Sequence, residues 1–164
     1  MRFHSSSPLG DDSLTPIVAA LQPLTADLLA LYASAKLAHW NVRGPGRMPF
    51  HKNFDKVAAD VAGHADMVAE RVFQLGEPAI GTPRQVVTMT RLADYPAETV
   101  DGFAHCRALC AQFEQAVVLV DAARDVADQN GDPDTYDLLT QVCRGLQKWC
   151  AELAAHVQSR EVRR

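Results

Sequence analysis

The sequence predicts an all-α protein: a bundle of four long helices in which a long crossover connection joins the second helix to the third. Apolar residues recur with the helical period of about 3.6 residues over four long segments, and no segment of useful length alternates as a half-buried strand would. The first and last connections are short, whereas residues 76–98 form a long connection broken by proline and glycine. This combination is typical of bundles with a single crossover.

The first helix is predicted over about residues 15–42. Thr15 can cap it, because its side-chain oxygen accepts from free N–H groups, and Pro16 suits the first helical position. Pro23 interrupts the pattern early, so we expect a kink or a later start. Residues 1–14 are polar and rich in serine, proline and glycine, and we expect them to form a flexible N-terminal tail.

The second helix is predicted from about Pro49 to about Leu75, between the helix-breaking segments 44–46 and 76–78. Proline is tolerated in the first turn of a helix, so Pro49 is consistent with this start. The long connection that follows holds a short amphipathic stretch near residues 85–92. We expect this stretch to form a small helix within the crossover.

The third helix is predicted over about residues 99–130, and the fourth over about residues 133–157. An Asn-Gly-Asp-Pro sequence separates them and marks a tight turn. The chain is therefore expected to form one domain, a ferritin-like four-helix bundle over residues 15–158, followed by a short basic C-terminal tail, residues 159–164.

Composition narrows the class of protein. A chain of 164 residues suits one domain, and 48% apolar with 22% charged residues is ordinary for a globular protein. The formal net charge of −4 argues against a basic nucleic-acid binder. No apolar run approaches the roughly 18 residues that span a membrane, and the N-terminus lacks the apolar core of a secretory signal. A soluble, cytoplasmic protein is expected.

Four cysteines fall on the last two predicted helices, at positions 106, 110, 143 and 150. The first two are one helical turn apart and the last two are two turns apart. A four-cysteine zinc site is the less favoured interpretation, because structural zinc sites prefer the tight turns of Cys-x-x-Cys. We expect small, reduced core residues instead.

Five metal-capable side chains follow one another at intervals of 12, 4, 11 and 4 residues: His39, His51, Asp55, Asp66 and Glu70. The last four lie on one predicted helix and within a stripe roughly 100° wide. Along the axis, Asp55 and Asp66 are about 16 Å apart. Metal–ligand bonds are only about 2 Å long, so the two pairs cannot bind the same ion.

One helix thus carries two half-sites. If two such helices pack antiparallel about a two-fold axis, the His51/Asp55 half of one chain faces the Asp66/Glu70 half of its partner. The spacing therefore predicts a dimer with two identical metal sites at the seam. Histidine and carboxylate ligands without a thiolate suit iron, manganese or zinc.

Each of these residues also has an ordinary structural interpretation. His39 could be a buried histidine bonded to a main-chain carbonyl, and the aspartates could be solvated charges. Glu70 with Arg71 could belong to a surface salt-bridge pattern. Apolar residues are interleaved with the four ligand positions on the second predicted helix, which is unusual for a solvent-exposed charged face. The four positions taken together therefore favour the metal site.

The motif around these residues resembles a known family. The string HWNVRG at residues 39–44, followed by HxxxD from His51 and DxxxER from Asp66, resembles the ferroxidase signature of the Dps family (DNA-binding protein from starved cells). These proteins are mini-ferritins of the ferritin-like superfamily. The resemblance extends loosely over most of the chain, including the connecting GEPAIGTP segment.

The resemblance implies that His39, His51 and Asp55 of one subunit face Asp66 and Glu70 of its neighbour. It further implies oxidation of Fe(II) there, with hydrogen peroxide as the preferred oxidant, and storage of ferric mineral inside a hollow dodecamer under oxidative stress. Zinc or manganese could substitute for iron. By resemblance Trp40, beside the first ligand, can quench stray oxidising equivalents, although core packing is expected to be its main role. Lys36 and Arg43 also match, as structural or salt-bridge residues.

A run of aspartates surrounds the turn between the third and fourth predicted helices. In the family this region lines acidic pores through which iron enters, and Asp128 and Asp137 match such positions best. The alternative is a solvated loop in which Asp132 caps the helix ahead of Pro133. The acidic run begins at Asp125, and the candidate pore residues are Asp128, Asp132, Asp134 and Asp137.

DNA binding is the alternative function, in which the chain compacts DNA and the metal site is secondary. Family members that condense DNA use lysine-rich tails, because phosphate contacts supply most non-specific affinity. The N-terminal tail offers only Arg2 and His4, against Asp11 and Asp12. The C-terminal arginines, at positions 160, 163 and 164, are a weakly basic alternative. Strong DNA binding is therefore not expected.

Overall fold

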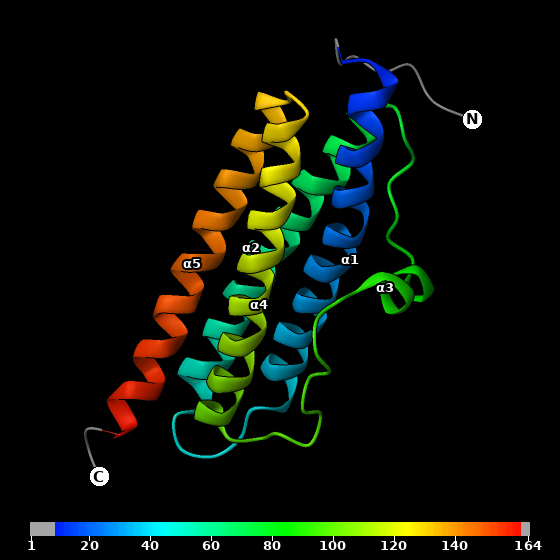
Figure 1. The fold of residues 1–164 in the computed structure, drawn as a ribbon. Coiled ribbons are helices and arrows are strands. Elements are labelled where there is room, and N and C mark those ends of the chain that lie inside the picture. Colours follow the sequence, from blue (N-terminus) through cyan, green and yellow to red (C-terminus); the bar gives the residue numbers. More distant parts are fainter. Residues whose placement is uncertain (1–8, 162–164) are drawn as a thin grey trace.

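The computed structural model describes residues 9–161 and shows a bundle of four long helices with one short helix on its side (Figure 1). No strand occurs in this part of the chain, so the prediction of an all-α bundle with a long crossover is confirmed. The four long helices are α1 (Asp11–Asn41), α2 (Arg47–Gln74), α4 (Gly102–Gln129) and α5 (Pro133–Glu161), and the short one is α3 (Pro83–Met89).

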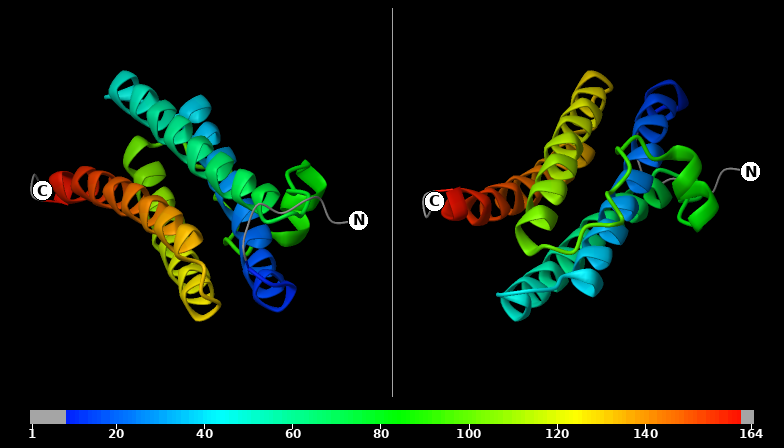
Figure 2. Two further views of the ribbon diagram at one scale, coloured as in Figure 1. Left: turned by 90° about the horizontal axis from the view of Figure 1, so that it is seen from above. Right: turned by 90° about the horizontal axis from the view of Figure 1, so that it is seen from below.

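The long helices form two antiparallel pairs. Helices α1 and α2 make one pair and α4 and α5 the other, and the two pairs lie against each other as two layers (Figure 2). Leucine, valine and phenylalanine side chains from all four helices meet between the layers. The largest fully buried ones include Leu24, Leu28, Phe54, Phe113, Leu139 and Leu146.

The first helix begins earlier than the sequence predicts. Its N-terminal cap position is Gly10, whose carbonyl accepts from the N–H groups of Ser13 and Leu14 at 3.0 and 3.1 Å. Thr15 is therefore inside α1 rather than at its cap, and residues 11–14 are helical rather than part of a tail. Helix α1 continues through Pro16 and Pro23, although each proline lacks the N–H group that would donate a helical hydrogen bond. Burial of the apolar stripe of α1, from Leu14 and Ile17 onward, compensates for these missing hydrogen bonds.

The boundaries of the other long helices differ from the predicted ones by a few residues. Helix α2 begins at Arg47 rather than at Pro49, and α4 begins at Gly102 rather than near residue 99. Helix α5 continues to Glu161, into the segment that was expected to be a basic tail. Residues 1–8 and 162–164, which belong to the two predicted tails, lie outside the described residues.

The crossover is fixed to α1 by a buried aspartate. Asp27 is fully buried, and its carboxylate accepts from Nε and Nη2 of Arg91 at 3.0 and 2.6 Å and from the Arg91 main-chain N–H at 2.6 Å. Thr90 Oγ1 donates to the same carboxylate at 3.1 Å. Helix α3 consequently lies beside α1 on the outside of the bundle (Figure 1).

Helix α1 is long and apolar enough, over Asp12–Asn41, to cross a membrane by length and composition alone. The expectation that no stretch approaches this limit is therefore wrong for α1. Half of its most apolar window is buried inside the bundle, and the helix carries the Asp27–Arg91 ion pair. A core helix of a bundle has these properties.

Candidate metal centre

His39 and His51 lie side by side where α1 ends and α2 begins. The His39 ring Nδ1 is 2.8 Å from the main-chain oxygen of His51, and the His51 Nδ1 is 2.8 Å from the main-chain oxygen of His39. The two rings stack with their centroids 3.8 Å apart. A carbonyl oxygen only accepts, so each Nδ1 donates a hydrogen. Each neutral imidazole therefore keeps its lone pair on Nε2, the form in which histidine binds a metal.

Asp55 lies one turn beyond His51 on α2 and completes the first half-site. Lys36 Nζ donates to Asp55 Oδ1 at 2.8 Å, and the Nδ1 of His39 is 3.8 Å from the same oxygen. The hydrogen bond from Lys36 holds the pKa of Asp55 below its ordinary value, so the carboxylate is ionised at neutral pH. Lys36 is thus the salt-bridge residue that the motif predicts.

Asp66 and Glu70 lie farther along α2, and both are exposed. Eleven residues separate Asp55 from Asp66 on a continuous helix, which corresponds to about 16 Å. Within residues 9–161 neither Asp66 nor Glu70 has a hydrogen-bond or ion-pair partner. The chain thus brings His39, His51 and Asp55 together and leaves the two remaining carboxylates apart.

A single chain does not close a site around these five residues. Among the described residues, none of them belongs to a group of three ligand atoms that lie within 4.8 Å of one another. This agrees with the two separate half-sites that the spacing predicts.

Trp40 does not pack into the core, so that part of the sequence prediction is wrong. Its side chain is 65% exposed, and Lys36 Nζ lies 5.9 Å from the ring centre. The core-facing positions in this turn of α1 are taken by Ala38 and Val42, which are buried. Trp40 consequently projects outward beside the first half-site.

A groove runs beside the second half-site, with Asp66 on its rim. Its volume is about 280 Å³, and it lies between α1, α2 and the crossover. Most of its lining is apolar: Leu29, Tyr32, Ala62, Ala65, Ala69 and Ile80. The two half-sites are thus flanked by an exposed aromatic ring at one and by an apolar hollow at the other.

The aspartates at the α4–α5 turn divide into two groups. Asp125, Asp128, Asp134 and Asp137 are exposed, as a pore lining requires, but Asp132 is only 2% exposed. Its Oδ1 accepts from the Thr135 main-chain N–H at 3.1 Å, which confirms the helix-capping interpretation. Arg71 Nη2 donates to both carboxylate oxygens, at 2.8 and 3.0 Å.

The electrostatics of Asp132 follow from these contacts. Burial alone would raise the pKa of its carboxyl, but hydrogen bonds from Thr135 and Arg71 outweigh burial and hold the pKa below its ordinary value. Its position in the sequence predicted a cap or a pore residue, and the contacts assign it to the cap. Arg71 pairs with Asp132, so the alternative in which Arg71 joins Glu70 in a surface salt-bridge pattern does not hold.

The sequence missed a second group of metal-capable side chains. It paired cysteines along each helix, whereas the structure brings Cys110 of α4 next to Cys150 of α5, with Glu114 beside them. Cys106 and Cys143 are buried core residues, as expected, and all four cysteines are free. The four-residue spacing from Cys110 to Glu114 was the available signal, but only the register between α4 and α5 adds Cys150.

Comparison with known proteins gives consistent matches. The ferritin-like domain family matches residues 18–161. The chain is 32% identical over 161 residues to the DNA protection during starvation protein of Agrobacterium fabrum, which covers 98% of this chain and 99% of that protein. It is 31% identical over 148 residues to the protein of the same name from Brevibacillus brevis, covering 85% and 95%. DpsC from Streptomyces coelicolor superposes with a TM-score of 0.90 at 27% identity, over 96% of this chain and 92% of that one.

Proposed function

Because this chain belongs to the ferritin-like superfamily and, within it, to the family of DNA protection during starvation (Dps) proteins, we propose that it is a mini-ferritin that oxidises Fe(II). In this proposal the oxidation takes place at sites shared between two subunits, and the ferric product is stored inside a hollow dodecamer. The observation that carries the proposal is the pair His39 and His51, whose Nε2 lone pairs are free because both Nδ1 atoms are bonded.

The arrangement of the two half-sites on α2 supports a shared site. They are separated by about 16 Å along one helix, too far for one ion but suited to an antiparallel partner. In such a dimer His39, His51 and Asp55 of one subunit face Asp66 and Glu70 of the partner subunit. The two-fold axis then generates a second, identical seam.

Trp40 and the apolar groove also fit this dimer. Trp40 is adjacent to His39, and the groove borders Asp66, so antiparallel pairing places each exposed tryptophan near its partner's groove. Burying an exposed aromatic ring in an apolar hollow is a strong contribution to association. The same contact keeps Trp40 next to the iron, where it can be oxidised in place of more sensitive groups.

The chemistry follows from the ligand types. Imidazole nitrogens hold ferrous iron, and the hard oxygens of Asp55, Asp66 and Glu70 favour the ferric product. Two ferrous ions supply the two electrons that, with two protons, reduce hydrogen peroxide to two waters. No single electron is then released to generate hydroxyl radical. Zinc and manganese suit the same ligands and would compete with iron at the seam.

Iron entry is assigned to the exposed aspartates of the α4–α5 turn. A hollow of about 210 Å³ lies beside this turn, lined in part by Asp128 and Tyr136. In the proposed shell, Asp128, Asp134 and Asp137 would concentrate cations at a subunit junction. Asp132 is left out of this set, because its carboxylate is engaged by Arg71 and Thr135.

Protection of DNA, which the names of the relatives mention, does not require contact with DNA in this proposal. Removing Fe(II) and peroxide together prevents radical damage at a distance. The net charge of −4 does not favour phosphate binding, so DNA compaction remains the secondary candidate. We place the protein in the cytoplasm, with oxidative stress as the condition under which it acts.

The test uses two inactive variants that complement each other. His51→Ala/Asp55→Ala removes one half-site, and Asp66→Ala/Glu70→Ala removes the other. Each variant alone should lose peroxide-driven Fe(II) oxidation. In a mixed dimer, one seam carries both defects and the other carries none. A co-expressed mixture should therefore recover about a quarter of the wild-type rate, because half of the dimers are mixed and each has one intact seam.

The control is Asp94→Ala/Glu98→Ala, which removes two exposed carboxylates from the crossover and should leave the rate unchanged. Absence of Fe(II) oxidation by the wild-type protein would overturn the proposed activity. An active wild type without recovery in the mixture would instead show that the site is not shared. A gel-shift with duplex DNA at low and moderate salt examines the secondary candidate.

A further inference from the structure

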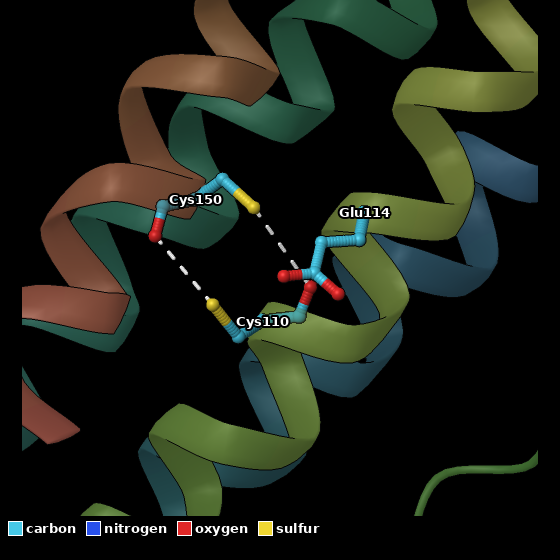
Figure 3. Close-up of side chains that lie close together, drawn as sticks. All are labelled: Cys110, Glu114 and Cys150. Carbon is cyan, nitrogen blue, oxygen red and sulfur yellow. Dashed lines mark hydrogen bonds between the residues drawn. The ribbon is translucent and has the colours of Figure 1, made fainter.

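A second group of metal-capable side chains lies in the layer opposite α1 and α2. Cys110 and Glu114 project from α4 and Cys150 from α5, and the three side chains point toward one another (Figure 3). One ligand atom from each lies within 4.8 Å of the other two. We infer that Cys110, Glu114 and Cys150 form a binding site for a thiophilic divalent cation of the Zn²⁺ class, separate from the iron seam.

The positions of the two sulfur atoms result from close approach of the helices. Cys110 Sγ is 3.5 Å from the main-chain oxygen of Cys150, and Cys150 Sγ is 3.9 Å from the main-chain oxygen of Cys110. Glu114 follows Cys110 by one helical turn and so shares its face of α4. The three ligands therefore come from two rigid helices and not from a loop, which preorganises the site.

The spacing is close to what zinc requires. With Zn–S bonds of about 2.3 Å and tetrahedral angles, two thiolate sulfurs are about 3.8 Å apart. Ligand atoms within 4.8 Å of one another need to move by about 1 Å or less to reach that spacing. Rotation of the Cys and Glu side chains supplies this movement without a shift of the helix axes.

The donor set selects the cation. Two sulfurs with one carboxylate favour Zn²⁺ over Fe²⁺, Mn²⁺ or Mg²⁺, whereas the iron seam offers only nitrogen and oxygen. On binding, each thiol loses its proton as its metal–sulfur bond forms, and two protons are released to solvent. Arg107 lines the same surface groove as Cys110 and Glu114.

Three protein ligands leave one position of a tetrahedral ion open. A groove of about 230 Å³ reaches Cys110 and Glu114 from the surface, between α4 and the end of α5. Water or an exchanging ligand can occupy the fourth position, as in zinc sites that are not purely structural. The site can therefore load and release its cation while the bundle stays folded.

A disulfide between Cys110 and Cys150 would use the same two sulfur atoms and would exclude the metal. Both cysteines are free in the structure, and each Sγ lies against a main-chain oxygen of the opposite helix. The reduced pair therefore presents two separate sulfur ligands to a cation.

The experiment uses the full chain carrying His51→Ala/Asp55→Ala, so that the iron seam no longer competes. The reduced protein is titrated with Co²⁺, and absorption from thiolate-to-cobalt charge transfer is followed in the near ultraviolet. We expect this absorption to saturate at one cobalt per chain and to disappear when Zn²⁺ is added. Zinc should also raise the melting temperature, because a bound ion links α4 to α5.

Single substitutions then identify the ligands. In the same background, Cys110→Ser and Cys150→Ser should each abolish the charge-transfer band, and Glu114→Gln should weaken Co²⁺ binding by at least about 10-fold. The matched control is Cys143→Ser, which removes a thiol on α5 outside the cluster and should leave the band unchanged. Glu114 is exposed, so Glu114→Gln reports on the site even if a cysteine variant fails to fold.

Either of two results would overturn the inference. The first is the absence of a thiolate-to-cobalt band in the reduced protein. The second is a band that persists in both Cys110→Ser and Cys150→Ser. Because the seam ligands are already removed in this background, neither result depends on whether the protein oxidises iron.

Discussion

His39 and His51 exchange hydrogen bonds, each ring Nδ1 donating at 2.8 Å to the other residue's main-chain oxygen. These two bonds tie the last turn of α1 to the first turn of α2. They also satisfy one nitrogen of each ring and leave the other nitrogen, Nε2, as the one that can bind a metal. A single structural contact thus determines both the tautomer and the orientation of two predicted iron ligands.

This contact predicts the effect of His51→Ala. The imidazole ligand is lost, but the His51 main-chain oxygen still accepts from His39, so the helix ends stay joined. We expect the initial rate of peroxide-driven Fe(II) oxidation to fall at least about 10-fold, by analogy with the loss of a metal-orienting group. The rate is measured by the absorbance of ferric product, and circular dichroism confirms the fold. An unchanged rate would show that His51 is not a ligand.

Trp40→Ala is expected to weaken the dimer without unfolding the chain. The side chain is 65% exposed in the single chain, so its removal leaves no cavity in the core. If the ring fills the partner's groove, association should weaken by about 2 kcal/mol, the size of an interface hot spot. Sedimentation at a series of concentrations measures this change. Val118→Ala, at a position 67% exposed, is the control. Equal association of both variants would argue against the proposed interface.

The substitution Asp132→Asn is expected to lower the free energy of unfolding by an amount that depends on pH. The folded-state pKa of Asp132 is lowered, so its ionised carboxylate stabilises the fold above the ordinary pKa of about 3.9. This stabilisation is lost as the pH falls through the lower folded-state pKa. At neutral pH the variant leaves the guanidinium of Arg71 without its partner, and we expect a loss of about 1–3 kcal/mol.

Urea unfolding of wild type and variant at several pH values measures this difference. The gap between the two proteins should be largest near neutral pH and should shrink as the pH falls below about 4. Asp134→Asn, an exposed carboxylate in the same helical turn, is the control and should show a much smaller gap. A gap that stays constant down to acid pH would contradict the assignment of the Arg71–Asp132 pair.

Gly102→Ala is expected to disrupt the start of α4. A Cβ atom at this position would lie less than 3.0 Å from three ring atoms of Phe50, which is itself buried. Overpacking of this kind costs about 1–3 kcal/mol. Thermal unfolding of Gly102→Ala measures this loss. The control is Gly10→Ala, because nothing lies within 4 Å of a Cβ atom added at that position. Phe50→Leu in the Gly102→Ala background should restore part of the loss, and failure to do so would place the strain elsewhere.

The sequence was sufficient for the helices and for the spacing of the ligands. Each rests on geometry within one helix, in which about 3.6 residues per turn and 1.5 Å per residue determine which side chains share a face. The separation of the two proposed half-sites on α2 could therefore be calculated from their residue numbers alone. The start of α1 at Asp11 could not, because burial of Leu14 and Ile17 extends the helix past the start signals of Thr15 and Pro16.

Contacts between helices were decided only by the tertiary structure. The pairing of Cys110 with Cys150, the capture of Asp132 by Arg71 and the outward position of Trp40 depend on the register and rotation of one helix against another. That register comes from how the apolar faces fit together, a property of the whole core and not of any local pattern. The sequence by itself determined the four long helices and the spacing along α2 from which a two-part metal site is proposed. The tertiary structure decided how the histidines are held and where a second, thiol-containing cluster lies.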